Sequence, residues 1–157
     1  MKKFLLTLIF VSNVVFGYSQ FANPQIANQT FCNTLNSYRK SLGLNPVTIE
    51  KSYYNFVSTH SHYQANINKV THGSGDSSFE NRLRNSNITP FGFFFENCTA
   101  VYFWKEMTIE DISVQSFLMF KGSPPHNSAM ISRDVNKICV AYYKIDNKVF
   151  VTLFLTN

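Results

Sequence analysis

The sequence predicts an α+β domain in which helices pack on a small antiparallel sheet. In the first half of the chain, apolar residues recur every three or four positions, as on one face of a helix. Near the C-terminus, residues 137–144 and 148–155 are two runs of β-favouring residues, and the Asp146-Asn147 pair between them suits a hairpin turn. The length of 157 residues fits one domain, and 16 phenylalanines and 8 tyrosines can fill its core.

The N-terminus has the pattern of a secretory signal peptide. Met1-Lys2-Lys3 precedes an apolar run over residues 4–16, and small residues, Gly17 and Ser19, occupy the −3 and −1 positions of a cleavage after Ser19. As a helix this run would rise only about 20 Å, too short for roughly 30 Å of hydrocarbon, so no transmembrane anchor is expected. We therefore expect a signal peptide at 1–19, a single domain at 20–157, and a secreted, extracellular or periplasmic protein.

The charge of the chain argues against a nucleic-acid partner. Removal of Lys2 and Lys3 would lower the formal net charge from +5 to +3. The remaining basic residues are scattered along the sequence and form no cluster.

Two long helices are predicted at the start of the mature chain. Residues 20–28 suggest an extended lead-in, and a helix is expected from Gln29 until Gly43 ends it. A second helix is expected over about 49–67. It carries His60 and His62, whose side chains should point in different directions because they are two residues apart. We expect both to be exposed or partly buried and neither to be a shared ligand.

The middle of the chain alternates loops and shorter helices. A glycine-bearing loop over 71–76 carries His72, a short helix is expected at 78–85, and residues 87–90 should be irregular. The aromatic run 91–95 leads directly into Glu96, whose carboxylate needs a partner in such apolar surroundings. A helix over about 108–120 should be capped by Thr108 together with Asp111.

The segment Ser-Pro-Pro-His-Asn at 123–127 must end that helix, because two prolines fix φ and remove backbone donors. It should present His126 at a rigid corner, suited to metal binding or proton transfer, unless the side chain only caps a helix and contacts solvent. A further helix can start at Asn127.

His72, Glu96 and His126 are the candidate site residues by their context. Two histidines and a carboxylate suit Zn²⁺ or another divalent cation, and the same trio suits acid–base chemistry without a metal. Separations of 24 and 30 residues define no local motif, so three unrelated polar residues remain the alternative.

The three cysteines, Cys32, Cys98 and Cys139, allow at most one disulfide bond, and the sequence leaves three pairings open. If a bridge forms, we expect Cys98–Cys139. Cys32 should remain a buried thiol beside the apolar face of the first helix.

Several segments in order resemble the CAP superfamily, which includes cysteine-rich secretory, antigen-five and pathogenesis-related proteins, and especially its short bacterial SCP-like secreted branch. Residues 35–39 and 42–46 resemble its opening helix and residues 138–142 and 149–154 its closing strands. Between them, His60-Ser61, His72, Glu96-Asn97 and the 123–127 segment follow in the family's order. The resemblance covers about residues 31–155.

This resemblance implies an α-β-α sandwich with a central cavity. His72, Glu96 and His126 match the family's cavity residues, Asn97, Ser123 and Asn127 support them, and His72 and His126 match the histidine pair that holds Zn²⁺ or another divalent cation in several members. A second family glutamate has no clear counterpart among Glu106, Glu110, Asp111 and Gln115. The family's usual tryptophan is Phe120 here.

The resemblance also implies binding of a metal, a small ligand or lipid, or a partner protein, and we favour binding over catalysis. The alternatives are a metal-assisted hydrolase that uses the same cavity residues and a secreted interaction protein with a vestigial cavity.

Overall fold

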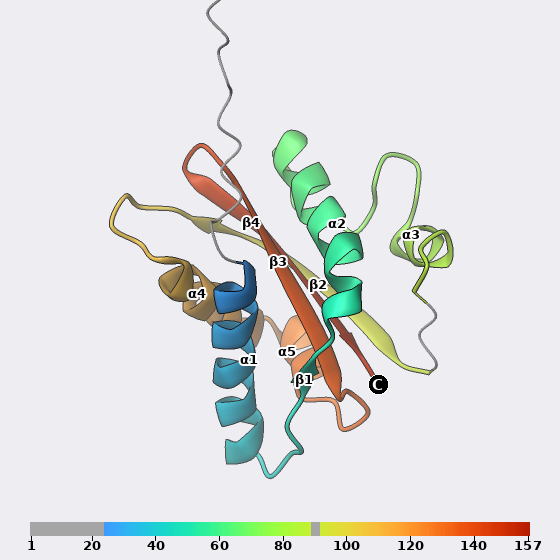
Figure 1. Cartoon of the computed structure of the whole chain (residues 1–157), viewed down its shortest axis with the longest axis vertical. Helices are drawn as coiled ribbons and strands as arrows, with labels where there is room; N and C mark the ends of the chain where they lie inside the picture. Colours follow the sequence, from blue (N-terminus) through green and yellow to red (C-terminus); the bar gives the residue numbers. More distant parts are fainter. Residues whose placement is uncertain (1–23, 89–91) are drawn as a thin grey trace, which may run out of the picture.

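The computed structural model describes residues 24–88 and 92–157, which form an α-β-α sandwich as predicted (Figure 1). The predicted signal peptide lies outside the described residues. A four-stranded sheet packs against α1, α4 and α5 on one face and against α2 and α3 on the other. In chain order the elements are α1 (Pro24–Ser41), β1 (Thr48–Ile49), the 3-10 helix η1 (Lys51–Tyr53), α2 (Tyr54–Asn66), α3 (Phe79–Arg84), β2 (Phe94–Tyr102), α4 (Ile109–Gly122), α5 (Pro124–Met130), β3 (Lys137–Ile145) and β4 (Lys148–Thr156).

The predicted C-terminal hairpin forms the centre of the sheet. Its strands β3 and β4 pair antiparallel, and Asp146 in the turn takes a φ of 49°, a left-handed conformation that aspartate tolerates. The strand order is β1-β3-β4-β2. Strand β2 pairs antiparallel with β4 along its whole length, whereas the two-residue β1 joins β3 in parallel.

Strand β2 is the main element that the sequence did not predict. Its segment was expected to be an aromatic run and irregular structure, yet nine residues pair with β4. A strand can be recognised in a sequence by alternating apolar and polar residues when one of its faces is exposed to solvent. Most of β2 is instead covered on both faces, and its polar residues, including Glu96 and Asn97, are buried, so that alternation is lost.

Two helix starts differ from expectation. Helix α1 covers Pro24–Ser41 and so includes residues 24–28, which were expected to belong to an extended lead-in. The expected second helix starts later, at Tyr54, after β1 and η1. By contrast, Thr108 and Asp111 form the predicted capping box of α4. None of the helices in the described part of the chain has an apolar stretch long enough to cross a membrane.

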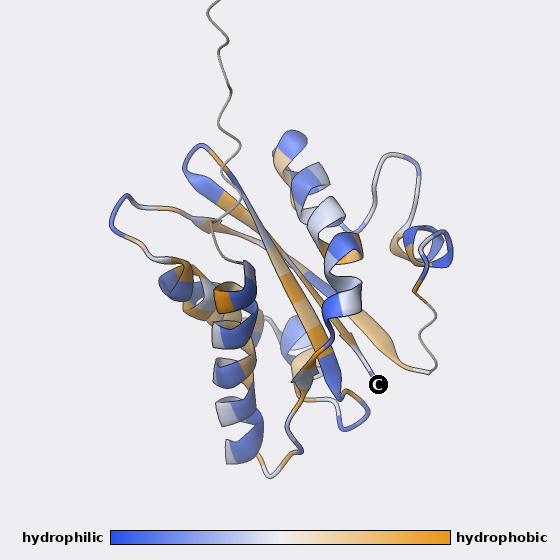
Figure 2. Ribbon diagram, viewed as in Figure 1, coloured by the Kyte–Doolittle hydropathy of each residue, from blue (hydrophilic) through white to orange (hydrophobic). Residues whose placement is uncertain are grey.

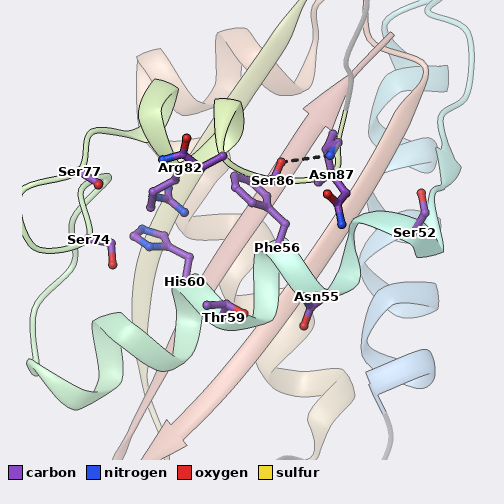
Figure 3. Close-up of a pocket in the computed structure, with 12 residues that line it drawn as sticks. Ser52, Asn55, Phe56, Thr59, His60, Ser74, Ser77, Arg82, Ser86 and Asn87 are labelled. Atoms are coloured by element: carbon purple, nitrogen blue, oxygen red, sulfur yellow. Dashed lines mark hydrogen bonds between the residues drawn. The ribbon is translucent and has the colours of Figure 1, made fainter.

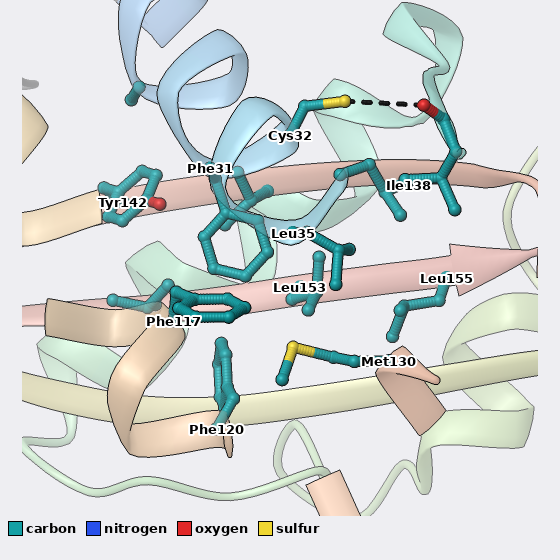
Figure 4. Close-up of a cluster of buried hydrophobic side chains, with 14 of the residues drawn as sticks. Phe31, Cys32, Leu35, Phe117, Phe120, Met130, Ile138, Tyr142, Leu153 and Leu155 are labelled. Atoms are coloured by element: carbon teal, nitrogen blue, oxygen red, sulfur yellow. Dashed lines mark hydrogen bonds between the residues drawn. The ribbon is translucent and has the colours of Figure 1, made fainter. Parts of the chain in front are cut away.

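Aromatic and aliphatic side chains fill the space between the sheet and helices α1, α4 and α5. The Phe31 ring meets those of Phe117 and Phe120 edge-on, with centroids 6.1 and 6.2 Å apart, and Leu35 and Met130 pack beside them (Figure 4). Hydrophobic residues run along the central strand β3, while α1 turns many polar residues outward (Figure 2). This core attaches α4, and hence the α5 segment that carries His126, to the sheet.

The predicted Cys98–Cys139 disulfide is wrong for this structure, in which all three cysteines are free and buried. Cys98 lies on β2 and Cys139 on β3, with β4 between them. Two strand spacings amount to about 9.6 Å, beyond the roughly 7 Å between Cα atoms that a disulfide spans. Cys32 is a buried thiol, as predicted.

Candidate functional site

The carboxylate of Glu96 is the centre of a buried polar network. Near the start of β2, its side chain faces α2 and α3 and is 1% exposed. Arg82 Nη2 donates to Oε2 at 2.6 Å, His72 Nδ1 lies 3.0 Å from Oε1, and His60 Nε2 lies 3.7 Å from the same oxygen. The sequence predicted that this carboxylate needs a partner, and that partner is Arg82, with His72 and His60 also close to it.

Arg82 ties the His72 loop to the sheet. It lies on α3, which begins where the Ser78 hydroxyl accepts a hydrogen bond from the Asn81 N–H. Its Nε and Nη2 donate to the carbonyl of His72 at 3.2 and 3.0 Å, in addition to the Glu96 contact. The guanidinium also lies over the ring of Phe56, 5.2 Å from its centroid. Sequence reasoning missed Arg82, because only the fold brings α3 over Glu96.

His72 combines a fixed ring with an accessible edge. Its side chain is 54% exposed, although Nδ1 is held by Glu96. The hydrogen bond to Glu96 raises the pKa of His72 above its ordinary value, and partial burial opposes this. A ligating histidine generally has one ring nitrogen held by a carboxylate in this way, which leaves Nε2 to face a cation.

His126 lies in the first turn of α5, because Pro124 and Pro125 occupy the first helical positions. The predicted helix start at Asn127 is therefore wrong. The ring of His126 meets Phe120 edge-on at 5.4 Å, and Asn97 Nδ2 donates to the His126 carbonyl at 3.0 Å. Burial lowers the pKa of His126, and the charge of His72 lowers it further.

The residues expected to support the site hold the start of α5. Ser123 is its N-cap, and the Ser123 carbonyl accepts a hydrogen bond from the Asn127 N–H at 2.8 Å. Asn97 reaches α5 from β2. Asn127 Oδ1 is buried without a hydrogen-bond partner among the described residues.

His60 was expected to be exposed or partly buried, and this prediction is wrong because the residue is buried. The prediction for His62 is confirmed, since it is exposed. His60 is 1% exposed, with Nε2 2.7 Å from the Thr71 carbonyl, and burial lowers its pKa. The buried residues of α2 are Val57, His60, Ser61, Gln64 and Ala65. Their spacing follows the helical repeat and could have placed His60 on the inner face.

His60, Glu96 and Cys98 also lie close enough to share a metal ion, with one ligand atom of each within 4.8 Å of the others. Two of these groups already have internal partners, since Glu96 pairs with Arg82 and His60 contacts Thr71. A cation here would lie beside the Arg82 guanidinium. His72 is better suited to bind a cation, because its side chain is more exposed and only its Nδ1 is held by Glu96.

No second carboxylate joins Glu96 in the described part of the chain. Glu106, Glu110, Asp111 and Gln115 are all exposed, and none forms a hydrogen bond or ion pair with Glu96, His72 or His126. Asp111 accepts hydrogen bonds from Thr108 in the capping box.

The fold is similar to those of several solved structures. A search of curated proteins gave no significant match. Among solved structures, an outer surface protein from Borrelia burgdorferi has a TM-score of 0.69 at 17% identity over 86% of this chain and 95% of its own. An extracellular SCP-domain protein from Bacillus anthracis has a TM-score of 0.64 at 14% identity over 83% of this chain and 40% of its own. NaASP2, crystallised with Zn²⁺, has a TM-score of 0.63 at 12% identity over 87% of this chain and 83% of its own.

At these identities the structural likeness establishes the fold alone. The sequence itself matches the family model described as CAP, the cysteine-rich secretory protein family, over residues 32–156. That match covers most of the chain, including His72, Glu96 and His126. The protein belongs to the CAP family.

Proposed function

We propose that this chain is a secreted binding protein whose cavity holds a divalent cation, with Zn²⁺ the first candidate, between His72 and His126. The observation that carries the proposal is the 3.0 Å contact between His72 Nδ1 and Glu96. This contact fixes the ring and leaves Nε2, on a half-exposed side chain, for a cation. The signal-like N-terminus and the extracellular or outer-surface relatives support secretion.

In this proposal Glu96 orients His72 and is not itself a ligand, because Arg82 occupies its other oxygen. Burial favours the neutral form of His126, which is the form that coordinates a metal. Two protein ligands leave the remaining positions of a tetrahedral cation for water or a small ligand.

Binding is better supported than hydrolysis by a serine or cysteine nucleophile. In the described residues no serine hydroxyl or cysteine thiol hydrogen-bonds to the ring of His60, His72 or His126, so no nucleophile–base pair is formed.

Calorimetry of Zn²⁺ binding to untagged protein tests the proposal. We expect one ion per chain, and loss of more than about tenfold in affinity in both His72→Ala and His126→Ala. His62→Ala is the matched control, because that exposed histidine should leave affinity unchanged. Affinity should also fall as the pH drops through the raised pKa of His72, since protons compete for the ring. Equal Zn²⁺ affinity in His126→Ala and the parent protein would contradict the proposal.

A further inference from the structure

A polar cleft of about 600 Å³ opens between α2, α3 and the loop that joins them (Figure 3). Asn55, Phe56 and Thr59 line it from α2, and Ser74 and Ser77 line it from the loop. Its volume is in the range of small-molecule sites, which span about 300–1,000 Å³. The cleft is therefore large enough for a ligand of a few rings.

Hydroxyl and amide groups with unused hydrogen-bonding capacity surround this cleft. Six of its side chains make no hydrogen bond to any described residue: Asn55, Thr59, Ser74, Ser77, Asn85 and Asn87. Each amide offers donors and an acceptor together, and each hydroxyl does both. Such groups match ligands that are themselves rich in hydroxyls.

The cleft is close to neutral, which argues against an anionic ligand. Arg82 is the only lysine, arginine, aspartate or glutamate that lines it, and its charge is balanced by the buried carboxylate of Glu96 at 2.6 Å. The Nη1 group of Arg82 has no hydrogen-bond partner among the described residues and can donate to a neutral oxygen. Phe56 adds an apolar surface for the carbon face of a ring.

We propose that this cleft binds a short neutral saccharide through its asparagine and hydroxyl side chains. The site uses neither His126 nor the free edge of His72, so it does not depend on the cation site proposed above. Among the described residues, Arg82 and His60 link the two sites, because both line the cleft and approach Glu96.

The test is calorimetry with three neutral trisaccharides, cellotriose, maltotriose and N,N′,N″-triacetylchitotriose, in buffer containing EDTA. We expect at least one to bind at millimolar concentration or below. Asn55→Ala on α2 and Asn87→Ala in the segment after α3 should each weaken binding about fivefold to tenfold through lost hydrogen bonds. Thr59→Trp, at an exposed position on α2, should abolish binding by filling the cleft.

Asn81→Ala is the matched control, because Asn81 is an exposed asparagine of α3 that does not line the cleft. Its affinity should equal that of the parent. Absence of binding by all three trisaccharides, equal affinity in the cleft variants and the parent, or tighter binding of tripolyphosphate than of any trisaccharide would each overturn the proposal. Because EDTA removes divalent cations, failure here is distinct from failure of Zn²⁺ binding.

Discussion

At the scale of single residues, the defining feature is a carboxylate removed from water and compensated from three directions. Glu96 receives its strongest contact from Arg82, while His72 and His60 approach Oε1. A buried charge without a partner is costly, so these contacts are needed for folding as well as for positioning His72. The same guanidinium holds the His72 carbonyl, which makes Arg82 a link between stability and site geometry.

Arg82→Met should therefore destabilise the protein by about 3 kcal/mol, because it leaves the Glu96 charge buried without its cation. Urea denaturation followed by circular dichroism measures this. The double variant Arg82→Met/Glu96→Gln should recover part of the loss, since the unpaired charge is then removed. A single-variant loss below about 1 kcal/mol would show that water reaches Glu96 in solution.

At the scale of elements, a second buried arginine holds the end of α1 against the last residue of α5 and the segment that follows it. Arg39 is 0% exposed, and its guanidinium donates to four carbonyls at 2.8–3.1 Å. These carbonyls belong to Asn45, Met130, Ser132 and Val135. The end of α1 is thereby joined to α5 and to the connection that leads into β3.

Arg39→Met should cost at least about 4 kcal/mol, because it leaves several buried carbonyls without donors. The free energy of unfolding, again from urea denaturation, is the measurement. Lys40→Met is the matched control at the next, exposed position of α1, and its effect should stay within about 0.5 kcal/mol. A similar loss in both variants would mean that α1 responds to substitution in general and not to the carbonyl contacts.

At the scale of the whole molecule, the two faces of the sheet have different roles. The face covered by α1, α4 and α5 is a continuous apolar core, whereas the face covered by α2 and α3 combines a smaller apolar cluster with the polar network around Glu96. His60 lies within that second layer, where burial lowers its pKa although the Glu96 carboxylate, 3.7 Å from Nε2, opposes this shift. Its titration therefore affects the stability of the entire fold.

The pH dependence of stability follows from the directions of the histidine pKa shifts. Because the pKa of His60 is lowered in the folded state, the unfolded chain binds more protons, and stability should fall as the pH drops below the ordinary value of 6.5. The raised pKa of His72 acts oppositely: its contribution is present below 6.5 and is lost as the pH rises through the folded pKa, and its exposure makes it weaker. His126 acts in the same direction as His60.

Thermal melts between pH 7.5 and 5.5 test this balance. The melting temperature of the parent should decrease toward pH 5.5, and His60→Gln should show a smaller decrease, because glutamine does not titrate. His62→Gln, at an exposed position of the same helix, should retain the slope of the parent. An unchanged slope in His60→Gln would rule out His60 as a source of the acid sensitivity.

Elements with local signals could be predicted from the amino-acid sequence. The capping box of Thr108 and Asp111, the turn at Asp146 and the end of α4 before the proline pair all depend on residues that are neighbours in the chain. The family followed from motifs in order, with His72 and His126 among them.

Contacts between groups that are distant in the chain could not be predicted in this way, because folding brings them together. Strand β2 exists because β4 offers it an edge, and Glu96 is neutralised by an arginine that lies 14 residues away in the chain. The position of β4 between Cys98 and Cys139 separates two thiols that the sequence left free to pair. In each case the deciding quantity is a distance between strands or layers, and spacing along a chain does not set such distances.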